Sequence, residues 1–305
     1  MYLRITARGA HSHTRAPSLE RLLARADGPT EFADWRAQAF QLIAPEGARV
    51  PPVATAALAP NARRVAGSWV CLATPVHLLA GMTSIGMAAD GLLDIEPDEA
   101  DALSIDFNRV FAGGGVSLER GRETLLVCRF DRPLRVETRP PEEAAGHDLW
   151  AYLPSGEDAP RLRSLTSEIE MWLFDHPVNR RRGEMQQPVI NALWLWGGGA
   201  ADAAAPPLCG WTAGEDPLFG SLAHASRYPG ASISGVVVVP DWPGSASWHA
   251  VEARWLAPAL ADLRAGQLKS IELSARHRCV RLNARALRRF WRRTRPWWEV
   301  LIDGD

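Results

Sequence analysis

Residues 191–196, NALWLW, constrain the fold more strongly than any other feature of the sequence. Successive side chains of a strand point to opposite faces, so Leu193 and Leu195 lie on one face and Ala192, Trp194 and Trp196 on the other. A strand that is apolar on both faces is typical of a parallel sheet covered by helices. The run VVVV at 236–239 repeats this pattern. We therefore expect both segments in one buried parallel sheet.

Strand and helix patterns alternate through the second half of the chain. After a helix over 161–174, the pattern predicts strands at 191–197, 232–240 and 268–275, helices at 216–228 and 247–266, and a short last strand around residues 279–282. This order predicts an α/β fold, with a layered, mostly parallel sheet in the C-terminal half and helices on both faces. The first half reads as α+β. We expect portions 1–145 and 146–305 within one continuous globular unit.

Composition excludes several classes of protein. The 34 basic and 35 acidic residues nearly balance, so no overall field attracts nucleic acid or an anionic membrane. Four scattered cysteines without a C-x-x-C pair indicate neither a zinc site nor a disulfide framework, and they favour a reducing compartment. Arg4 and Arg8 interrupt any signal-peptide core, and Pro75 and His77 interrupt the uncharged stretch 65–89. We expect a cytoplasmic protein without a membrane span.

Three glycines follow the doubly apolar strand. Gly197, Gly198 and Gly199 would lie at the carboxyl end of a parallel strand, the edge where open α/β sheets bind ligands. Bare backbone there approaches a phosphate or carboxylate closely, and Asp241 after the next strand would reach the same edge. The alternative is a glycine-rich connection without a ligand.

A polar block, HPVNRRR at 176–182, precedes this strand. A guanidinium such as that of Arg182 can clamp an anion through paired hydrogen bonds, and Asn179 can cap a helix. His176 lies beside a helix C-terminus, where a structural cap is the favoured role, and the arginines are equally consistent with a solvated face. The predicted ligand-binding residues are His176, Asn179, Arg182, Gly197, Gly198, Gly199 and Asp241.

Two stretches carry a family resemblance: GSWVCLATPVHL at 67–78 and SEIEMWLFDHPVNRRRGEMQQPVINALWLWGGG at 167–199. They resemble the RpfE-type regulatory proteins of proteobacteria, which are often labelled phosphoglycerate mutases. More distantly, the HPVN-x-x-R and N-x-x-W-L-W-G-x-G blocks are similar to the archaeal type of cofactor-independent phosphoglycerate mutase. The matching positions are His176, Pro177, Asn179, Arg182, Asn191, Trp194, Leu195, Trp196, Gly197 and Gly199.

The resemblance implies an alkaline-phosphatase-like frame, a superfamily whose chemistry needs two divalent metals held by Asp and His and a nucleophilic Ser. We find no N-terminal Asp-Gly metal motif of the kind that the resemblance implies, and no Asp-x-x-x-His block of the ligand type downstream of residue 231. Seven acids between 90 and 106 could hold a metal, but a solvated, dipole-matched helix start is favoured. We predict no metal site and no cofactor, and expect no competent phosphoglycerate mutase.

Residues 276–295 contain nine arginines and no acid, with Phe290 and Trp291 between them. A helix over 284–293 would turn Ala286, Leu287, Phe290 and Trp291 inward and the arginines outward. A nucleic-acid partner is therefore disfavoured, and docking of an acidic protein partner is the alternative use.

Three hypotheses remain for function. The preferred one is a regulatory-type protein with a mutase-like scaffold that lacks the two-metal site and binds a small phosphorylated or carboxylated metabolite. The second is a phosphoglycerate mutase or phosphatase with unrecognised metal ligands. The third is a nucleic-acid or protein adaptor that works through the arginine-rich C-terminal helix.

Overall fold

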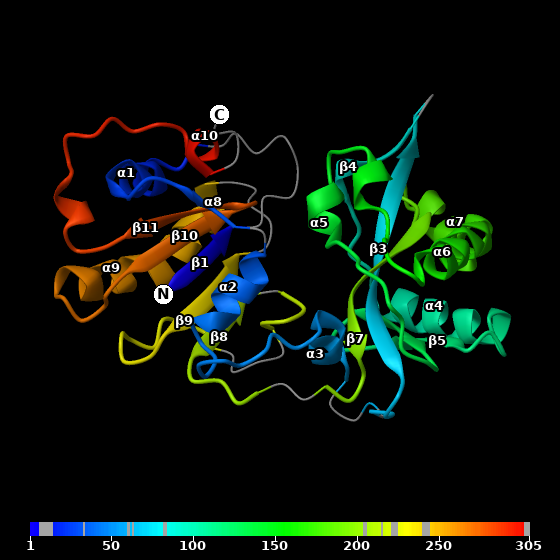
Figure 1. Ribbon diagram of the computed structural model, residues 1–305. Coiled ribbons are helices and arrows are strands. Elements are labelled where there is room, and N and C mark those ends of the chain that lie inside the picture. Colours follow the sequence, from blue (N-terminus) through cyan, green and yellow to red (C-terminus); the bar gives the residue numbers. More distant parts are fainter. Residues whose placement is uncertain are drawn as a thin grey trace. The chain divides into compact units, whose positions relative to one another are not determined.

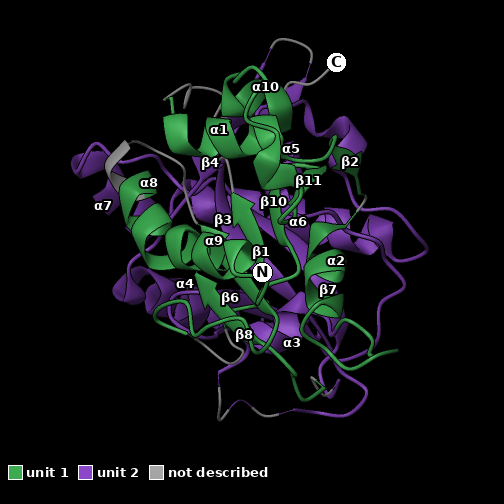
Figure 2. Ribbon diagram, turned by 90° about the vertical axis from the view of Figure 1, so that its left-hand side faces the viewer, with its two compact units in different colours: residues 1–50, 206–305 green, residues 51–205 purple. Residues whose placement is uncertain are grey.

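The computed structural model describes the chain except residues 6–14, 33, 60–61, 63, 82–83, 204–205, 215, 221–224, 240–244 and 302–305; for residue 89 and residues 245–247 only the backbone is described. The chain forms two compact units (Figure 1 and Figure 2). Unit 1 comprises Met1–Val50 with Pro206–Asp305, and unit 2 comprises Pro51–Ala205. Unit 2 is thus inserted, in sequence, between two parts of unit 1.

Unit 1 is built on a mostly parallel sheet. Its strands in spatial order are β2 (Thr30–Glu31), β11 (Arg278–Leu282), β10 (Ile271–Ala275), β1 (Tyr2–Ile5), β9 (Gly235–Val239) and β8 (Trp211–Gly214). β1 pairs in parallel with β9 and β10, and β8 pairs in parallel with β9, whereas β11 is antiparallel to both its neighbours. The predicted parallel sheet is present, but β1, between β9 and β10, comes from the start of the chain.

Helices cover both faces of this sheet. Leu3 and Ile5 of β1 pack into an apolar core together with residues of α1 (Pro17–Arg25), α8 (Ser245–Val251), α9 (Ala257–Arg264) and α10 (Trp297–Leu301). Arg4 points to the other face, where its guanidinium carbon lies 4.7 Å from the ring centroid of Trp35 on α2 (Trp35–Gln41). The helix expected over 247–266 is confirmed as α8, the π-helical turn Glu252–Leu256 and α9 in one continuous run.

Unit 2 contains an antiparallel sheet. Its order is β4 (Ile85–Leu92), β3 (Trp69–Ala80), β6 (Leu126–Phe130) and β5 (Val116–Arg120), and β7 (Ala192–Ala200) also pairs with β3. Its helices are α3 (Val53–Ala57), α4 (Pro97–Val110), α5 (Pro141–Ala144), the 3-10 turn Leu149–Tyr152, α6 (Ala159–Phe174) and α7 (Pro177–Glu184). Figure 1 shows β3 as the long strand with α4, α6 and α7 on one side and α3 on the other.

The prediction that β7 belongs to a parallel sheet was wrong. β7 runs antiparallel to β3, with Thr74 opposite Trp194 and Val76 opposite Ala192. Both faces of β7 are nevertheless covered as expected: Leu193 and Leu195 pack with α6, and Trp196 packs with α3. The apolar pattern reports burial on both faces, and burial alone does not set strand direction.

The three glycines belong to β7 itself and do not form an open edge. The pairing with β3 shifts by one residue between Val70 and Leu72, and Gly197 adopts φ +66°, which is the conformation of a glycine bulge. A Cβ on Gly198 would lie 2.1 Å from Cζ2 of Trp69, and one on Gly199 would lie 2.2 Å from Cγ of Pro52. The glycines therefore make room for neighbouring side chains, which corrects the expectation of bare backbone facing a ligand.

The unit boundaries lie at 50/51 and 205/206, whereas the sequence suggested a division at 145/146. The difference arises because β7, after residue 146, pairs with β3, before it. The expectation of one continuous globular unit stays a prediction.

Within the residues that the structure describes, two expected helices are not found. Residues 217–220 form turns, and residues 221–224 of the helix predicted over 216–228 lie outside the described residues. The C-terminal helix predicted over 284–293 is reduced to the 3-10 turn Ala286–Arg288.

The uncharged stretch 65–89 is explained by β3 and β4, which bury much of it in a sheet. Among the described residues, no helix combines the length and the apolar character needed to cross a bilayer. Cys71, Cys128 and Cys279 are buried and free, as expected for small apolar residues, while Cys209 is exposed.

We predict that Gly198→Ala destabilises the protein by about 1 to 3 kcal/mol or more, because the new methyl group overlaps the Trp69 ring. The control is Gly183→Ala in α7, where no atom lies within 4 Å of the added Cβ and the helix gains roughly 0.5 to 1 kcal/mol. Urea unfolding measures both. Wild-type stability in Gly198→Ala would contradict the packing described here.

Candidate functional site

The HPVN-x-x-R residues lie where α6 ends and α7 begins. His176 is the N-cap of α7, and its Nδ1 accepts the N–H of Val178 at 3.2 Å. Pro177 follows at the first helical position, where its missing N–H costs no hydrogen bond. These contacts are those of the structural cap favoured for His176.

Arg182 on α7 is buried, with 4% of its surface exposed, and its guanidinium donates four hydrogen bonds. Nε and Nη2 bind the two carboxylate oxygens of Glu99 on α4 at 2.7 and 3.0 Å. Nη1 donates to the carbonyl of Pro188 at 3.0 Å, and Nη2 donates to that of Asp94 at 2.6 Å. An internal carboxylate thus takes the place expected for a ligand. We call this set of contacts the Arg182 latch.

Glu99 is ionised at neutral pH in this arrangement. Burial acts to raise the pKa of Glu99, but hydrogen bonds from Arg182 and from the N–H of Glu96 outweigh it and hold the pKa below its ordinary value. Glu99 also completes a capping box with Glu96 at the start of α4. The Arg182 latch is therefore a buried ion pair that also fixes a helix end.

Two asparagine side chains hold the segments around the Arg182 latch, because each forms hydrogen bonds with both the backbone N–H and the carbonyl of a single residue. Asn179 accepts the N–H of Ile190 at 2.8 Å and donates to its carbonyl at 2.7 Å, and a second donor bond reaches Leu173. Asn191 does the same with Leu78 of β3, at 2.7 Å for both bonds. Each side-chain amide thus makes the pair of hydrogen bonds that the backbone of a neighbouring strand would make. Asn179 and Asn191 therefore hold the chain between α7 and β7 against the sheet.

His176 faces a carboxylate on its other side. Its Nε2 lies 3.4 Å from Oδ2 of Asp106, and the Trp172 ring packs edge-on at 4.8 Å. Because Nδ1 accepts a hydrogen bond, the proton of the neutral ring belongs on Nε2. Burial lowers the pKa of His176, the Asp106 charge partly opposes this, and Arg180 lowers it further. The hydrogen bond from Trp172 holds the pKa of Asp106 below its ordinary value.

The structure does not bring all the expected site residues together. His176, Asn179 and Arg182 meet near the start of β7, but Gly198 is six residues beyond Ala192, roughly 20 Å along an extended strand. Asp241 lies outside the described residues. Ligand binding by these residues stays a prediction. The contacts described for His176, Asn179, Arg182 and the three glycines are structural contacts with other parts of unit 2.

The acidic cluster at 90–106 does not fit a two-metal site. Glu99 is bound by Arg182, Asp101 pairs with Arg120 at 2.9 Å, and Asp106 is held by Trp172. Within the described ranges, no group of three or more His, Cys, Asp and Glu side chains is arranged to hold a metal ion. His11 and His13 lie outside those ranges.

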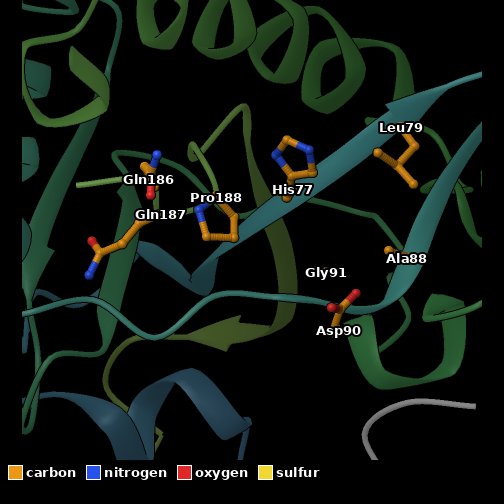
Figure 3. A pocket seen from close by; sticks show the side chains of 8 residues that line it. All are labelled: His77, Leu79, Ala88, Asp90, Gly91, Gln186, Gln187 and Pro188. Atoms are coloured by element: carbon orange, nitrogen blue, oxygen red, sulfur yellow. The ribbon is translucent and has the colours of Figure 1, made fainter. Parts of the chain in front are cut away.

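A groove opens beside the Arg182 latch where β4 bulges away from β3. Val76 of β3 pairs with Leu92 of β4, and Leu78 pairs with Met87. β4 therefore advances five residues where β3 advances two, and the extra residues lie opposite His77. The groove has a volume of about 510 Å³ and is shown in Figure 3. Its lining residues are His77, Leu79, Ala88, Asp90, Gly91, Gln186, Gln187 and Pro188. Bulges of this kind often lie beside functional sites, where they redirect a side chain.

The polar groups of the groove are held in place from behind. His77 Nδ1 lies 2.8 Å from the carbonyl of Val189, which can only accept, so Nδ1 carries the hydrogen and Nε2 is left for a ligand. Gln186 has φ +56°, an uncommon conformation for a residue with a side chain, and the Pro188 carbonyl is held by the Arg182 latch. The side chains of Asp90, Gln186 and Gln187 form no hydrogen bond within the described part of the chain.

Sequence reasoning missed this groove. The available signal was Asp90-Gly91 inside a strand pattern, since an isolated glycine there indicates a bulge. A Cβ on Gly91 would lie 2.8 Å from the carbonyl oxygen of His77.

Segments of the chain are similar to known enzymes. It is 34% identical over 122 residues to the 2,3-bisphosphoglycerate-independent phosphoglycerate mutase of Methanothrix thermoacetophila, a match that covers 37% of this chain and 30% of that protein. It is 32% identical over 82 residues to the corresponding mutase of Methanosarcina barkeri, covering 27% of this chain and 21% of that protein. These matches indicate distant homology to cofactor-independent phosphoglycerate mutases, and the chain spans less than a third of either relative.

No protein-family model matches the chain. Among solved structures, the cofactor-independent phosphoglycerate mutase from Thermoplasma acidophilum aligns with a TM-score of 0.36 and 13% identity, over 92% of this chain and 89% of that one.

We predict that His176 makes stability depend on pH. Because the folded pKa lies below the ordinary value of 6.5, the unfolded chain binds a proton first as the pH falls. The free energy of unfolding should therefore decrease from about pH 6.5 down through the folded pKa of His176. His176→Asn keeps a helix cap and should remove this dependence, as measured by urea unfolding between about pH 7.5 and 5.

The control is His249→Asn, whose side chain is 76% exposed and should retain the wild-type dependence. Identical pH profiles for the wild type and His176→Asn would contradict the role given to His176.

Proposed function

We propose that this chain is a cytoplasmic, regulatory-type protein of the RpfE kind that binds a small phosphorylated or carboxylated metabolite on a mutase-like scaffold. It does not carry out two-metal phosphoryl transfer. The observation that carries the proposal is the use of Arg182: its donors are taken by Glu99 and by two carbonyls, one of them on the rim of the groove. In this interpretation the motif that resembles the mutases supports the groove, and the guanidinium of Arg182 binds internal partners in place of the ligand.

The chemistry of the groove favours a hydroxylated acid. The side-chain amides of Gln186 and Gln187 can donate to carboxylate or phosphate oxygens, and Nε2 of His77, whose ring hydrogen is on Nδ1, can accept a hydrogen bond from a ligand hydroxyl. Asp90 disfavours a bare anion but can accept a hydrogen bond from a ligand hydroxyl. A phosphoglycerate or a similar hydroxy acid presents both kinds of group. In this account Arg182 is a positioning residue that acts through Pro188.

We predict that about 10 mM 3-phosphoglycerate raises the melting temperature of the full chain by a few degrees. A ligand at ten times its Kd contributes about 1.4 kcal/mol. His77→Ala should abolish the rise, because Nε2 would no longer contact the ligand. His249→Ala, an exposed histidine of unit 1, is the matched control and should keep it. No rise in the wild type, or an undiminished rise in His77→Ala, would refute the proposal.

A second function, a cofactor-independent mutase with unrecognised metal ligands, is favoured by the similarity to mutases. Metal analysis of purified protein separates the two functions. Stoichiometric manganese or zinc together with turnover of phosphoglycerate would establish the enzyme and overturn our proposal. Metabolite binding without turnover in added manganese would support the proposal of a regulatory-type protein.

A further inference from the structure

Residues 285–295 lie in a largely exposed connection between β11 and α10 of unit 1. In Figure 1 it is the orange-to-red stretch that runs past α1. Phe290 is 77% exposed and Trp291 is 69% exposed, and their rings meet edge to face at 5.5 Å. The expected inward stripe is therefore wrong for both aromatic residues, since no helix forms here to turn them toward the core. For this segment, a nucleic-acid partner was disfavoured because of that stripe, which the structure does not form.

Two arginines of this stretch fasten it to the end of α1. Arg289 Nη1 donates to Oδ1 of Asp27 at 2.6 Å, and Arg292 Nη1 donates to the carbonyl of Ala26 at 2.9 Å. Carbonyl groups at a helix C-terminus carry partial negative charge, which favours guanidinium groups there. Arg289 and Arg292 therefore have a structural use, and they hold the connection in a defined place.

The other four arginines have no such use. Arg285, Arg288, Arg293 and Arg295 are exposed, and their side chains form no hydrogen bond or ion pair within the described residues. The whole chain has a net charge of −1, so this concentration of positive charge is local and is not a consequence of a basic protein. We call these four arginines with Phe290 and Trp291 the Arg-aromatic surface.

We propose that the Arg-aromatic surface binds single-stranded nucleic acid. Exposed aromatic rings stack on bases, and arginines bind phosphates, so the two kinds of side chain together match a chain that offers both. The irregular backbone lacks a helix that could enter the groove of a duplex, which favours a single strand. Carboxylates of an acidic protein would pair with the arginines but would not stack on the two rings, whereas every nucleotide offers both a phosphate and a base. This proposal is independent of the metabolite site in unit 2.

The salt dependence of binding follows from the number of free arginines. Each phosphate contact on a single strand contributes a slope of about −0.7 in log K against log salt. Four contacts give about −3, so raising the salt from about 50 to 200 mM should weaken binding roughly 50-fold. Anisotropy of a labelled oligothymidylate of about 20 nucleotides, titrated with the full chain, measures this.

Two variants separate stacking from charge. Phe290→Ala with Trp291→Ala should weaken binding of the oligothymidylate at least about tenfold while the salt slope stays unchanged. Arg288→Gln with Arg293→Gln should reduce the steepness of the slope by about 1.4. The matched control is Arg254→Gln with Arg264→Gln, two exposed arginines of unit 1 outside this surface, which should bind as the wild type does.

Heparin, an acidic polypeptide and vesicles of anionic lipid serve as competing probes. Loss of oligothymidylate binding in the aromatic variant, with heparin binding retained, supports the proposal. Absence of oligothymidylate binding at low salt overturns it, as does binding that the aromatic variant leaves unchanged. Preference for the acidic polypeptide or the vesicles would also overturn it, in favour of a protein or membrane partner.

Discussion

The buried ion pair between Arg182 and Glu99 is the contact on which the arrangement of unit 2 depends. Removing two charges from water costs several kcal/mol for each ion, and the loss is offset only when geometry is good and other donors are satisfied. Here the pair is bidentate, and the same guanidinium reaches the carbonyls of Asp94 and Pro188. The spacing of α4, α7 and the chain entering β7 follows from this one side chain.

The residues that resemble the mutases are, in this chain, largely parts of a frame. His176 caps a helix, Asn179 and Asn191 replace missing strand partners, and the glycines of β7 admit the side chains of Pro52 and Trp69. Similarity to an enzyme can therefore persist through residues that serve folding. The groove at the β4 bulge is lined by different residues. The polar groups of this groove that are not used by the frame are available to a ligand.

Patterns of burial could be predicted from the sequence, but pairing and loop contacts could not. The valine run of β9 and the helix 161–174 were predicted correctly, because periodicity reports which faces are covered. The direction of β7 depends on its partner β3, more than a hundred residues away, and apolar periodicity does not encode it. The prediction of a C-terminal helix was wrong because Arg289 and Arg292 bind the end of α1, and the segment that carries them has an irregular conformation. The groove arises from a register shift around His77, which leaves only one glycine as a sequence signal.

A double-mutant cycle at Arg182 and Glu99 tests the central claim most directly. The free energy of unfolding would be measured for Arg182→Met, Glu99→Leu and the double variant. Each single change should cost about 3 to 5 kcal/mol, because it leaves a buried charge without its partner. The double variant should cost at least about 2 kcal/mol less than the sum, because no unpaired charge remains. Costs that add to within about 0.5 kcal/mol would contradict the account, since the two side chains would then not depend on each other.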